Sequence, residues 1–240
     1  MSNIAFLSDI HGNLNALDAV LADIHARGME RVFCLGDLVG YGPWPGEVIG
    51  RIRAENIPTI MGNYDEAVGF TLPVCGCHIN DRRAKALSQH ALKWAVDHTT
   101  AQDRAYLRAL PESLSIEVAG VSFLLNHASM DSITEYVYQT DAERMREIAA
   151  QTAEDVYVYG HTHFPFHEAV GGKHIINAGS VGRPKDGDNR AGYVVAHIEN
   201  GTVSTQIIRV GYDVNQVVAD MRARGIATAL CRFLQNGGEK

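Results

Sequence analysis

The chain lacks the features that mark membrane-bound, secreted and nucleic-acid-coating proteins. None of its apolar runs approaches the roughly 20 residues that a membrane-spanning helix needs. Residues 1–10 have no basic start and already contain Asp9, so they do not resemble a signal peptide. Four cysteines are too few for a disulfide framework in 240 residues. A formal net charge of −7 argues against general binding to a phosphate backbone. These absences predict a cytoplasmic protein with no membrane partner.

The chain also lacks a linker. No long stretch rich in Pro, Ser or Gly, no block of like charge and no repeat interrupts residues 1–240. Hydrophobic residues make up 46% of the chain, which is enough to fill one large core. We therefore predict a single domain over residues 1–240, and no pattern indicates a particular oligomeric state.

Strand-like and helix-like segments alternate in the first half of the chain, and strands dominate the last third. Short β-branched and aromatic runs predict strands, and apolar residues at helical spacing predict helices. The expected strands cover residues 4–7, 32–35, 58–61, 115–118, 121–125, 156–159, 166–170, 174–176, 193–198 and 203–209. The expected helices cover residues 14–28, 45–55, 81–98, a segment after Thr100, 141–151 and a segment after Asp213. Two packed sheets flanked by helices accommodate this order.

Short polar motifs follow five of the expected strands. In chain order they are Asp9-Ile-His11, Gly36-Asp37, Gly62-Asn63-Tyr64-Asp65, Asn126-His127 and Gly160-His161-Thr162-His163. Side chains just past the carboxyl ends of strands converge on one crevice in open α/β sheets. The motifs offer seven potential metal ligands, namely Asp9, His11, Asp37, Asn63, His127, His161 and His163.

Two carboxylates, one amide and four imidazoles are the ligands of a two-metal hydrolytic site. Phosphoester hydrolysis needs neutralised phosphoryl oxygens and a nucleophile at neutral pH, and two metals about 3.5–4 Å apart supply both. Asp37, after the Gly36 turn, is the candidate bridging ligand. A donor set without thiolate favours two divalent transition-metal ions (Mn, Fe, Ni, Co or Zn) over Ca or Mg. The sequence does not choose among them, and manganese is our working choice.

Each motif alone has a commoner structural explanation. Asp-x-His usually lies in a surface loop, Gly-Asp usually forms a turn, and a lone His127 is more often a satisfied polar residue than a ligand. Gly-His-x-His is more specific because its two imidazoles are two residues apart. The order of the motifs and their common place after strands favour one metal site.

This order of motifs resembles the calcineurin-like metallophosphoesterase superfamily. The segments Gly36–Pro43 and Asn177–Pro184 are similar to its small prokaryotic, phosphodiesterase-type members. The resemblance implies a four-layer α-β-β-α sandwich of two mixed sheets flanked by helices. It also implies one metal held by Asp9, His11, Asp37 and His163, and a second held by Asp37, Asn63, His127 and His161.

The chain departs from the family pattern at Tyr64. The family usually has a histidine there, which assists the leaving group or contacts phosphate and is oriented by the next acid, here Asp65. We therefore expect Asn63, Tyr64 and Asp65 to be catalytic. Tyrosine, with an ordinary pKa of about 10, is a weaker acid at neutral pH, so Tyr64 either donates a proton or only packs. Residues 36–40 also lack the Asp-Arg-Gly continuation of the protein phosphatase branch.

Two further segments have competing explanations. Arg183, Lys185 and Arg190 lie in a loop after the last motif and form either a solvated surface or a substrate contact, and we expect Arg183 to bind the substrate phosphate. Cys75-Gly76-Cys77 with His78 could bind metal. A CxC motif without a second pair is more often a reduced loop.

The sequence thus predicts a cytoplasmic, two-metal-dependent phosphoester hydrolase. A phosphodiesterase that uses a metal-bridging hydroxide on a small phosphoester, including a nucleotide-derived one, fits best, because a weak general acid penalises poor leaving groups. The alternatives are a nucleotide or protein phosphatase and a binding module that kept the fold and lost catalysis. Intact ligand types argue against the binding module.

Overall fold

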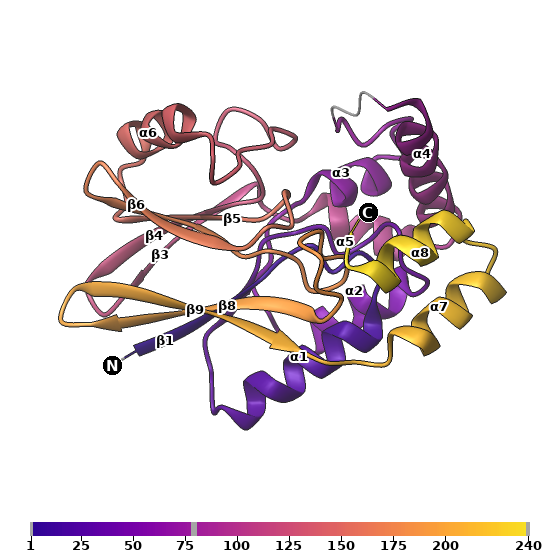
Figure 1. Ribbon diagram of the computed structural model, residues 1–240, viewed down its shortest axis with the longest axis horizontal. Coiled ribbons are helices and arrows are strands. Elements are labelled where there is room, and N and C mark those ends of the chain that lie inside the picture. The colour runs from indigo at the N-terminus through magenta and orange to yellow at the C-terminus, as the bar shows by residue number, and fades with distance from the viewer. Residues whose placement is uncertain (1, 78–80, 239–240) are drawn as a thin grey trace.

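Two mixed β-sheets form the centre of the protein in the computed structural model, which describes residues 2–77 and 81–238 (Figure 1). The four-stranded sheet has the order β2-β1-β8-β9, and the five-stranded sheet has the order β3-β4-β5-β7-β6. The bounds of the first sheet are β1 (Ser2–Leu7), β2 (Val32–Cys34), β8 (Ala191–Glu199) and β9 (Thr202–Val210). Those of the second are β3 (Ser113–Val118), β4 (Val121–Asn126), β5 (Val156–Tyr159), β6 (Phe166–Val170) and β7 (Lys173–Asn177).

The two sheets pack face to face, and β1 shows why. Side chains alternate between the two faces of a strand. Ile4 and Phe6 of β1 enter the apolar cluster between the sheets, where the Phe6 and Phe123 rings lie 6.0 Å apart between centroids. Ala5 and Leu7 enter a separate cluster on the opposite face, against the helices. The strand is therefore buried on both faces, as the unbroken apolar run at 4–7 predicts.

Helices cover the outer face of each sheet. α1 (Leu14–Ala26) contacts β8 and β9, and α6 (Ala142–Gln151) contacts β6 and β7 (Figure 1). The prediction of a four-layer sandwich is thus confirmed. The remaining helices are α2 (Pro45–Ala54), α3 (Asn63–Gly69), α4 (Arg82–Asp97), α5 (Ala101–Arg108), α7 (Val214–Ala223) and α8 (Thr228–Asn236). Across the described part of the chain, no helix combines the length and apolar character that crossing a bilayer requires.

Capping signals in the sequence place several helix starts correctly. The Asn13 side chain accepts a hydrogen bond from Ala16 N at the start of α1. Thr100 and Asp103 form a reciprocal capping box at the start of α5. Pro45 occupies the first turn of α2, where its missing N–H has no partner to lose.

One expectation for local structure was wrong, and one helix was not expected. Residues 58–61 form no strand; only an isolated bridge pairs Thr59 with Cys34, since the chain turns into α3 at Asn63 almost immediately. No sequence pattern predicts α3, which begins inside a predicted ligand motif. Its start is stabilised by Asp65, whose carboxylate accepts the backbone N–H of Gly62 at 3.1 Å. A helix as short as α3 has no long apolar face, so the spacing of apolar residues does not predict it.

The carboxyl ends of parallel strands meet along one side of the sandwich. β1 runs parallel to β2, and β4, β5 and β7 run parallel to one another. The predicted ligands Asp9 and His11 follow β1, Asp37 follows β2, His127 follows β4, and His161 and His163 follow β5. Both sheets therefore deliver polar side chains to a shared crevice.

Candidate metal centre

An unusual backbone marks the candidate site. Asp9, His11, Asp37, His161 and His163 all have positive φ angles, between 50° and 67°. This left-handed region is uncommon for residues with a side chain, and such strain persists only where the surroundings hold it. Backbone hydrogen bonds between the loops do so here, from Asp9 N to Gly36 O at 3.0 Å and from His11 N to Asp37 O at 2.9 Å. Five strained residues at one place indicate a functional site.

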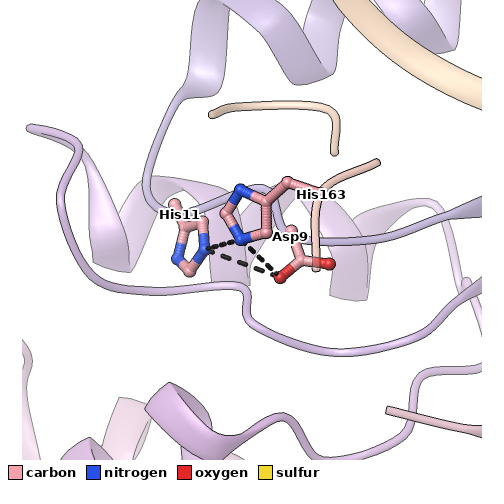
Figure 2. Close-up of side chains that lie close together, drawn as sticks. All are labelled: Asp9, His11 and His163. Atoms are coloured by element: carbon pink, nitrogen blue, oxygen red, sulfur yellow. Dashed lines mark hydrogen bonds and ion pairs between the residues drawn. The ribbon is translucent and has the colours of Figure 1, made fainter. Parts of the chain in front are cut away.

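Asp9, His11 and His163 form the first side-chain cluster (Figure 2). The His163 Nε2 lies 3.0 Å from Asp9 Oδ1 and 3.2 Å from His11 Nε2. The His11 Nε2 lies 3.6 Å from Asp9 Oδ1. All three residues are buried, so their polar atoms face one another and not bulk water.

Asp37 lies between this cluster and a second one. Its Oδ2 is 3.7 Å from His11 Nε2 and 3.6 Å from His127 Nε2. The Asn63 Oδ1 lies 3.1 Å from His127 Nε2, and the rings of His127 and His161 are 5.1 Å apart between centroids, edge to face. Asp9, Asp37 and His127 also satisfy the geometry of a three-ligand metal group. The structure therefore brings together all seven predicted ligand residues, which we call the floor of the site.

Backbone carbonyls fix the orientation of three floor imidazoles. The Nδ1 atoms of His11, His127 and His163 bond the carbonyl oxygens of Val39, Leu35 and Arg183, respectively. A carbonyl only accepts, so each Nδ1 carries the proton and each Nε2 of the neutral ring carries a lone pair. Such outer contacts hold the tautomer that a metal ligand needs.

Several hydrogen-bond acceptor atoms of the floor consequently lie next to other acceptor atoms. The bare Nε2 of His163 faces a carboxylate oxygen of Asp9 and the bare Nε2 of His11, and His127 Nε2 faces the amide oxygen of Asn63. Within the described residues, Asp9 Oδ1 and His161 Nε2 are buried without a hydrogen-bond partner. Unpaired buried acceptors are costly, and a cation among them removes that cost. The arrangement fits bound metal ions.

The electrostatics of the floor agree with its geometry. Burial and the charge of Lys185 lower the pKa of His163 to about 4, and burial also lowers the pKa of His11, His127 and His161. Burial, with the nearby carboxylates of Asp9 and Asp65, raises the pKa of Asp37 well above its ordinary value. A bound cation would favour the charged carboxylate and neutral imidazoles that ligation requires.

The hydroxyl end of the Tyr64 side chain points away from the floor. The hydroxyl lies 2.8 Å from Ser88 Oγ on α4, and the ring packs edge-on against the His11 ring at 5.4 Å. The backbone N–H of Tyr64 donates to Asp37 Oδ1 at 2.8 Å. Burial raises the pKa of this phenol well above its ordinary value. The observed contacts thus connect Tyr64 to the floor through its ring and its backbone.

Asp65 and Asn63 hold the neighbouring loops. The two carboxylate oxygens of Asp65 accept the backbone N–H groups of Leu38 and Gly62, at 2.9 and 3.1 Å. The Asn63 Nδ2 donates to Cys75 O at 2.9 Å and contacts Cys77 Sγ at 3.2 Å. The amide oxygen of Asn63 is thereby turned toward the floor.

The CxC segment forms no metal cluster among the residues that the structure describes. Cys75 and Cys77 carry free thiols and belong to no group of potential metal ligands there. Their contact with Asn63 places the segment beside the floor. His78, the third residue of the tentative motif, lies outside the described residues.

Four residues surround the floor, and we call them the rim: Tyr41, Tyr136, Arg183 and Lys185. The Arg183 guanidinium carbon lies 4.0 Å from the centroid of the Tyr41 ring and 3.7 Å from that of Phe233. The Tyr136 ring lies 4.3 Å from the His161 ring. Arg190, by contrast, pairs with Asp188 on an exposed surface. Tyr136 lies in a loop without motif or periodicity, so no sequence pattern indicates that it belongs to the site.

Comparisons with known proteins agree with this geometry. The family model described as the calcineurin-like phosphoesterase superfamily domain matches residues 2–201. A metallophosphoesterase structure from Sphaerobacter thermophilus has a TM-score of 0.80 and 30% identity, covering 98% of this chain and 99% of that one. An uncharacterized protein of Methanocaldococcus jannaschii, MJ0912, is 32% identical over 90% of both chains. The phosphodiesterase YfcE of Escherichia coli is 26% identical over 80% of this chain and 86% of its own length.

The fold and the buried carboxylate–imidazole clusters define the class of a metal-dependent hydrolase. The chain belongs to the calcineurin-like phosphoesterase superfamily, since the family model covers most of it. The protein is accordingly a metallophosphoesterase with a phosphoester substrate. The resemblance noted from its motifs is confirmed.

Proposed function

We propose that this protein is a two-metal-dependent phosphodiesterase acting on small phosphoesters, including nucleotide-derived ones. The observation that carries the proposal is the position of Asp37, whose Oδ2 lies 3.7 Å from His11 Nε2 and 3.6 Å from His127 Nε2. A single carboxylate placed between two groups of ligands suits a bridging role. The named activity of YfcE, a phosphodiesterase, supports the choice of substrate.

The floor divides into two ligand sets that share Asp37. One set consists of Asp9, His11, Asp37 and His163, and the other consists of Asp37, Asn63, His127 and His161. The acceptor-to-acceptor contacts at 3.0, 3.1 and 3.2 Å fit both sets, since a cation would separate and satisfy those atoms. Manganese is our first choice of metal, and the cytoplasm is the location that we propose.

Bound metals would supply charge neutralisation of the phosphoryl oxygens and a hydroxide nucleophile at neutral pH. The protein's own task is to hold the ligands rigidly and to exclude water from the side of the ligands that faces the protein interior. The carbonyls behind the imidazoles and the backbone N–H of Tyr64 behind Asp37 perform the first task. Nearly complete burial of the floor performs the second.

The surroundings of Tyr64 favour a diester substrate or an ester with an activated leaving group. Its hydroxyl bonds Ser88 Oγ, and burial raises its pKa well above the ordinary value, so we propose that Tyr64 packs beneath His11 and donates no proton. We likewise propose that Asp65 positions the loops at Leu38 and Gly62. Asn63 is then the member of this motif that acts directly, as a metal ligand.

We propose that Arg183 binds the substrate phosphate. Its guanidinium is stacked between the rings of Tyr41 and Phe233, which fixes its plane and leaves its N–H edge available. The Arg183 carbonyl also accepts from His163 Nδ1, so the same residue is attached to the floor through its backbone.

A metal-reconstitution experiment tests the proposed function. Metal-stripped protein receives Mn, Ni, Fe or Zn, and each sample is assayed on a panel of phosphodiesters and phosphomonoesters, with metal content measured in parallel. We expect two metals per chain and faster turnover of diesters. His25 lies on the exposed surface of α1, so the variant His25→Ala is a matched control for changes to the floor histidines.

Three results would contradict the proposal in different ways. Undiminished hydrolysis by stripped protein would reject metal dependence. Preference for nucleotide monoesters or phosphopeptides would replace the phosphodiesterase by a phosphatase. Stoichiometric metal binding without turnover of any ester would leave a binding module of the same fold.

A further inference from the structure

We propose that Lys185 is a catalytic residue whose ammonium group contacts the leaving oxygen of the ester. The inference rests on the proposed phosphodiesterase function and adds a role that the floor does not provide. Three features support this role: Lys185 lies at the rim, its Nζ has no hydrogen-bond or ion-pair partner among the described residues, and the C-terminal segment holds its loop.

The side chain of Lys185 lies beside an aromatic ring that itself packs on the floor. Its Nζ lies 5.5 Å from the centroid of the Tyr136 ring, and that ring lies 4.3 Å from the ring of His161. Lys185 is half-buried, whereas the floor residues below it are buried. The ammonium group is therefore located on the outer side of the site, between the ligands and solvent.

The acidic residues nearest to Lys185 in its own loop pair with other cations. Asp186 pairs with Arg209, and Asp188 pairs with Arg190. Within residues 2–77 and 81–238, the Lys185 Nζ makes no hydrogen bond and no ion pair. Burial, together with the charge of Arg183, lowers the pKa of Lys185 to about 8. A partly desolvated cation that faces a phosphoester site without a local partner is suited to bind developing negative charge.

The C-terminal helix holds the loop of Lys185. The backbone N–H of Gly187 donates to Gly237 O at 2.8 Å, and Asn189 Nδ2 donates to Gln235 O at 2.9 Å. The Phe233 ring of α8 stacks on Arg183 in the same loop. All of these contacts, from α8 and from Gly237 just after it, come from beyond residue 201, where the family match ends. This chain thus positions its rim cations with a segment outside the matched family domain.

In an in-line displacement the leaving group departs opposite the nucleophile, which by our proposal is the side of Lys185. With metal ions held by the floor ligands, a hydroxide there would form the new P–O bond, and the bond from phosphorus to the leaving oxygen would break on the opposite side. The electron pair of that bond goes to the leaving oxygen, which takes a proton from Lys185 Nζ, and Lys185 regains a proton from water. The Tyr64 hydroxyl lies 2.8 Å from Ser88 Oγ, and by the proposed function it donates no proton in this step.

The first test compares leaving groups in the metal-loaded protein. Lys185→Met and Lys185→Arg are assayed on a 4-nitrophenyl diester and an alkyl diester, with Lys93→Met on the exposed face of α4 as the control. We expect Lys185→Met to lower kcat for the alkyl ester by roughly 10²–10³-fold and for the 4-nitrophenyl ester by less than about fivefold. Lys185→Arg should retain part of the alkyl activity. Equal losses on both esters, or no loss, would overturn the proposal.

The second test does not depend on turnover. Inorganic phosphate is titrated by calorimetry into metal-loaded wild type, Lys185→Met and Lys93→Met, after metal content and Tm have been matched. We expect roughly tenfold weaker binding in Lys185→Met alone, as for loss of one charge-assisted contact. Should the wild type hydrolyse no ester, the proposed function fails, and this titration still decides the position of Lys185: equal affinities would overturn it.

Discussion

The floor and the rim of the site are built in opposite ways. The floor residues stand in short motifs directly after strands, with strained backbones and imidazoles fixed by main-chain carbonyls. Of the rim residues, Tyr41 and Arg183 stand in the two family-like segments 36–43 and 177–184, while Tyr136 and Lys185 lie in no recognised motif. The C-terminal segment holds the part that carries Arg183 and Lys185. Metal binding needs rigid ligands, so the floor tolerates little change. We expect substrate selection to depend on the rim and changes there to leave the metals undisturbed.

The largest expected effect comes from removing the shared carboxylate of the floor. Asp37→Asn should lower kcat/KM by about 10³-fold or more and reduce metal content at both positions. The reason is the loss of several kcal/mol of charge stabilisation, where about 1.4 kcal/mol corresponds to a tenfold change in rate. His11→Ala should mainly affect one metal. Metal analysis and kinetics measure both. Retention of two metals and a near-normal rate in Asp37→Asn would reject the bridge.

Acid should destabilise the metal-free floor. The folded-state pKa of His163, about 4, lies below its ordinary value of 6.5. The unfolded chain therefore binds more protons below pH 6.5, and stability present above that pH is lost as pH falls toward 4. For His163 alone the loss is about 3 kcal/mol. Urea unfolding of metal-free wild type and His163→Asn across this window isolates the contribution; parallel curves for the two proteins would contradict it.

A methyl group added beneath the floor should be poorly tolerated. In Gly160→Ala, the new Cβ would lie 1.9 Å from Ser8 Oγ and 2.6 Å from Asp9 Oδ2. We expect a loss of about 2 kcal/mol in unfolding free energy and a lower metal content. Gly50→Ala on α2 meets nothing within 4 Å and should instead gain about 0.5–1 kcal/mol. Denaturant titration measures the unfolding free energy of both variants. Equal stabilities of the two variants would contradict the prediction.

A change at the rim should alter substrate binding without altering metal content. Phe233→Leu removes the ring on one side of Arg183, whose stacking contributes about 1 kcal/mol. KM should rise up to about tenfold, with kcat and metal stoichiometry close to those of the wild type. Steady-state kinetics and metal analysis measure this. A loss of metal in Phe233→Leu would show that floor and rim are not independent.

The smallest expected effect concerns Tyr64. Tyr64→Phe keeps the ring under His11 and removes only the bond to Ser88, so it should cost about 1 kcal/mol of stability. Values of kcat/KM for aryl and alkyl esters should both stay within about threefold of the wild type. A selective loss on alkyl esters, on the order of 10²–10⁴-fold, would show that the hydroxyl donates a proton after all.

Sequence reasoning was strongest where a local pattern carries the information. The apolar run at 4–7, the Asn13 cap and the Thr100–Asp103 capping box each specify nearby structure. It failed at residues 58–61, where the chain makes only a bridge, and at the short helix α3. Both failures lie beside the floor, where contacts with other loops override local preference.

The sequence alone determined the family, the layered fold and the residue types of the floor, because strand periodicity and ligand motifs are properties of short segments. Only the tertiary structure decided that Asp37 lies between two imidazoles, that Tyr64 turns its hydroxyl to Ser88, and that Lys185 lies against the Tyr136 ring. These are relations between segments far apart in the chain. They depend on how the two sheets and α8 pack, and no local pattern encodes that packing.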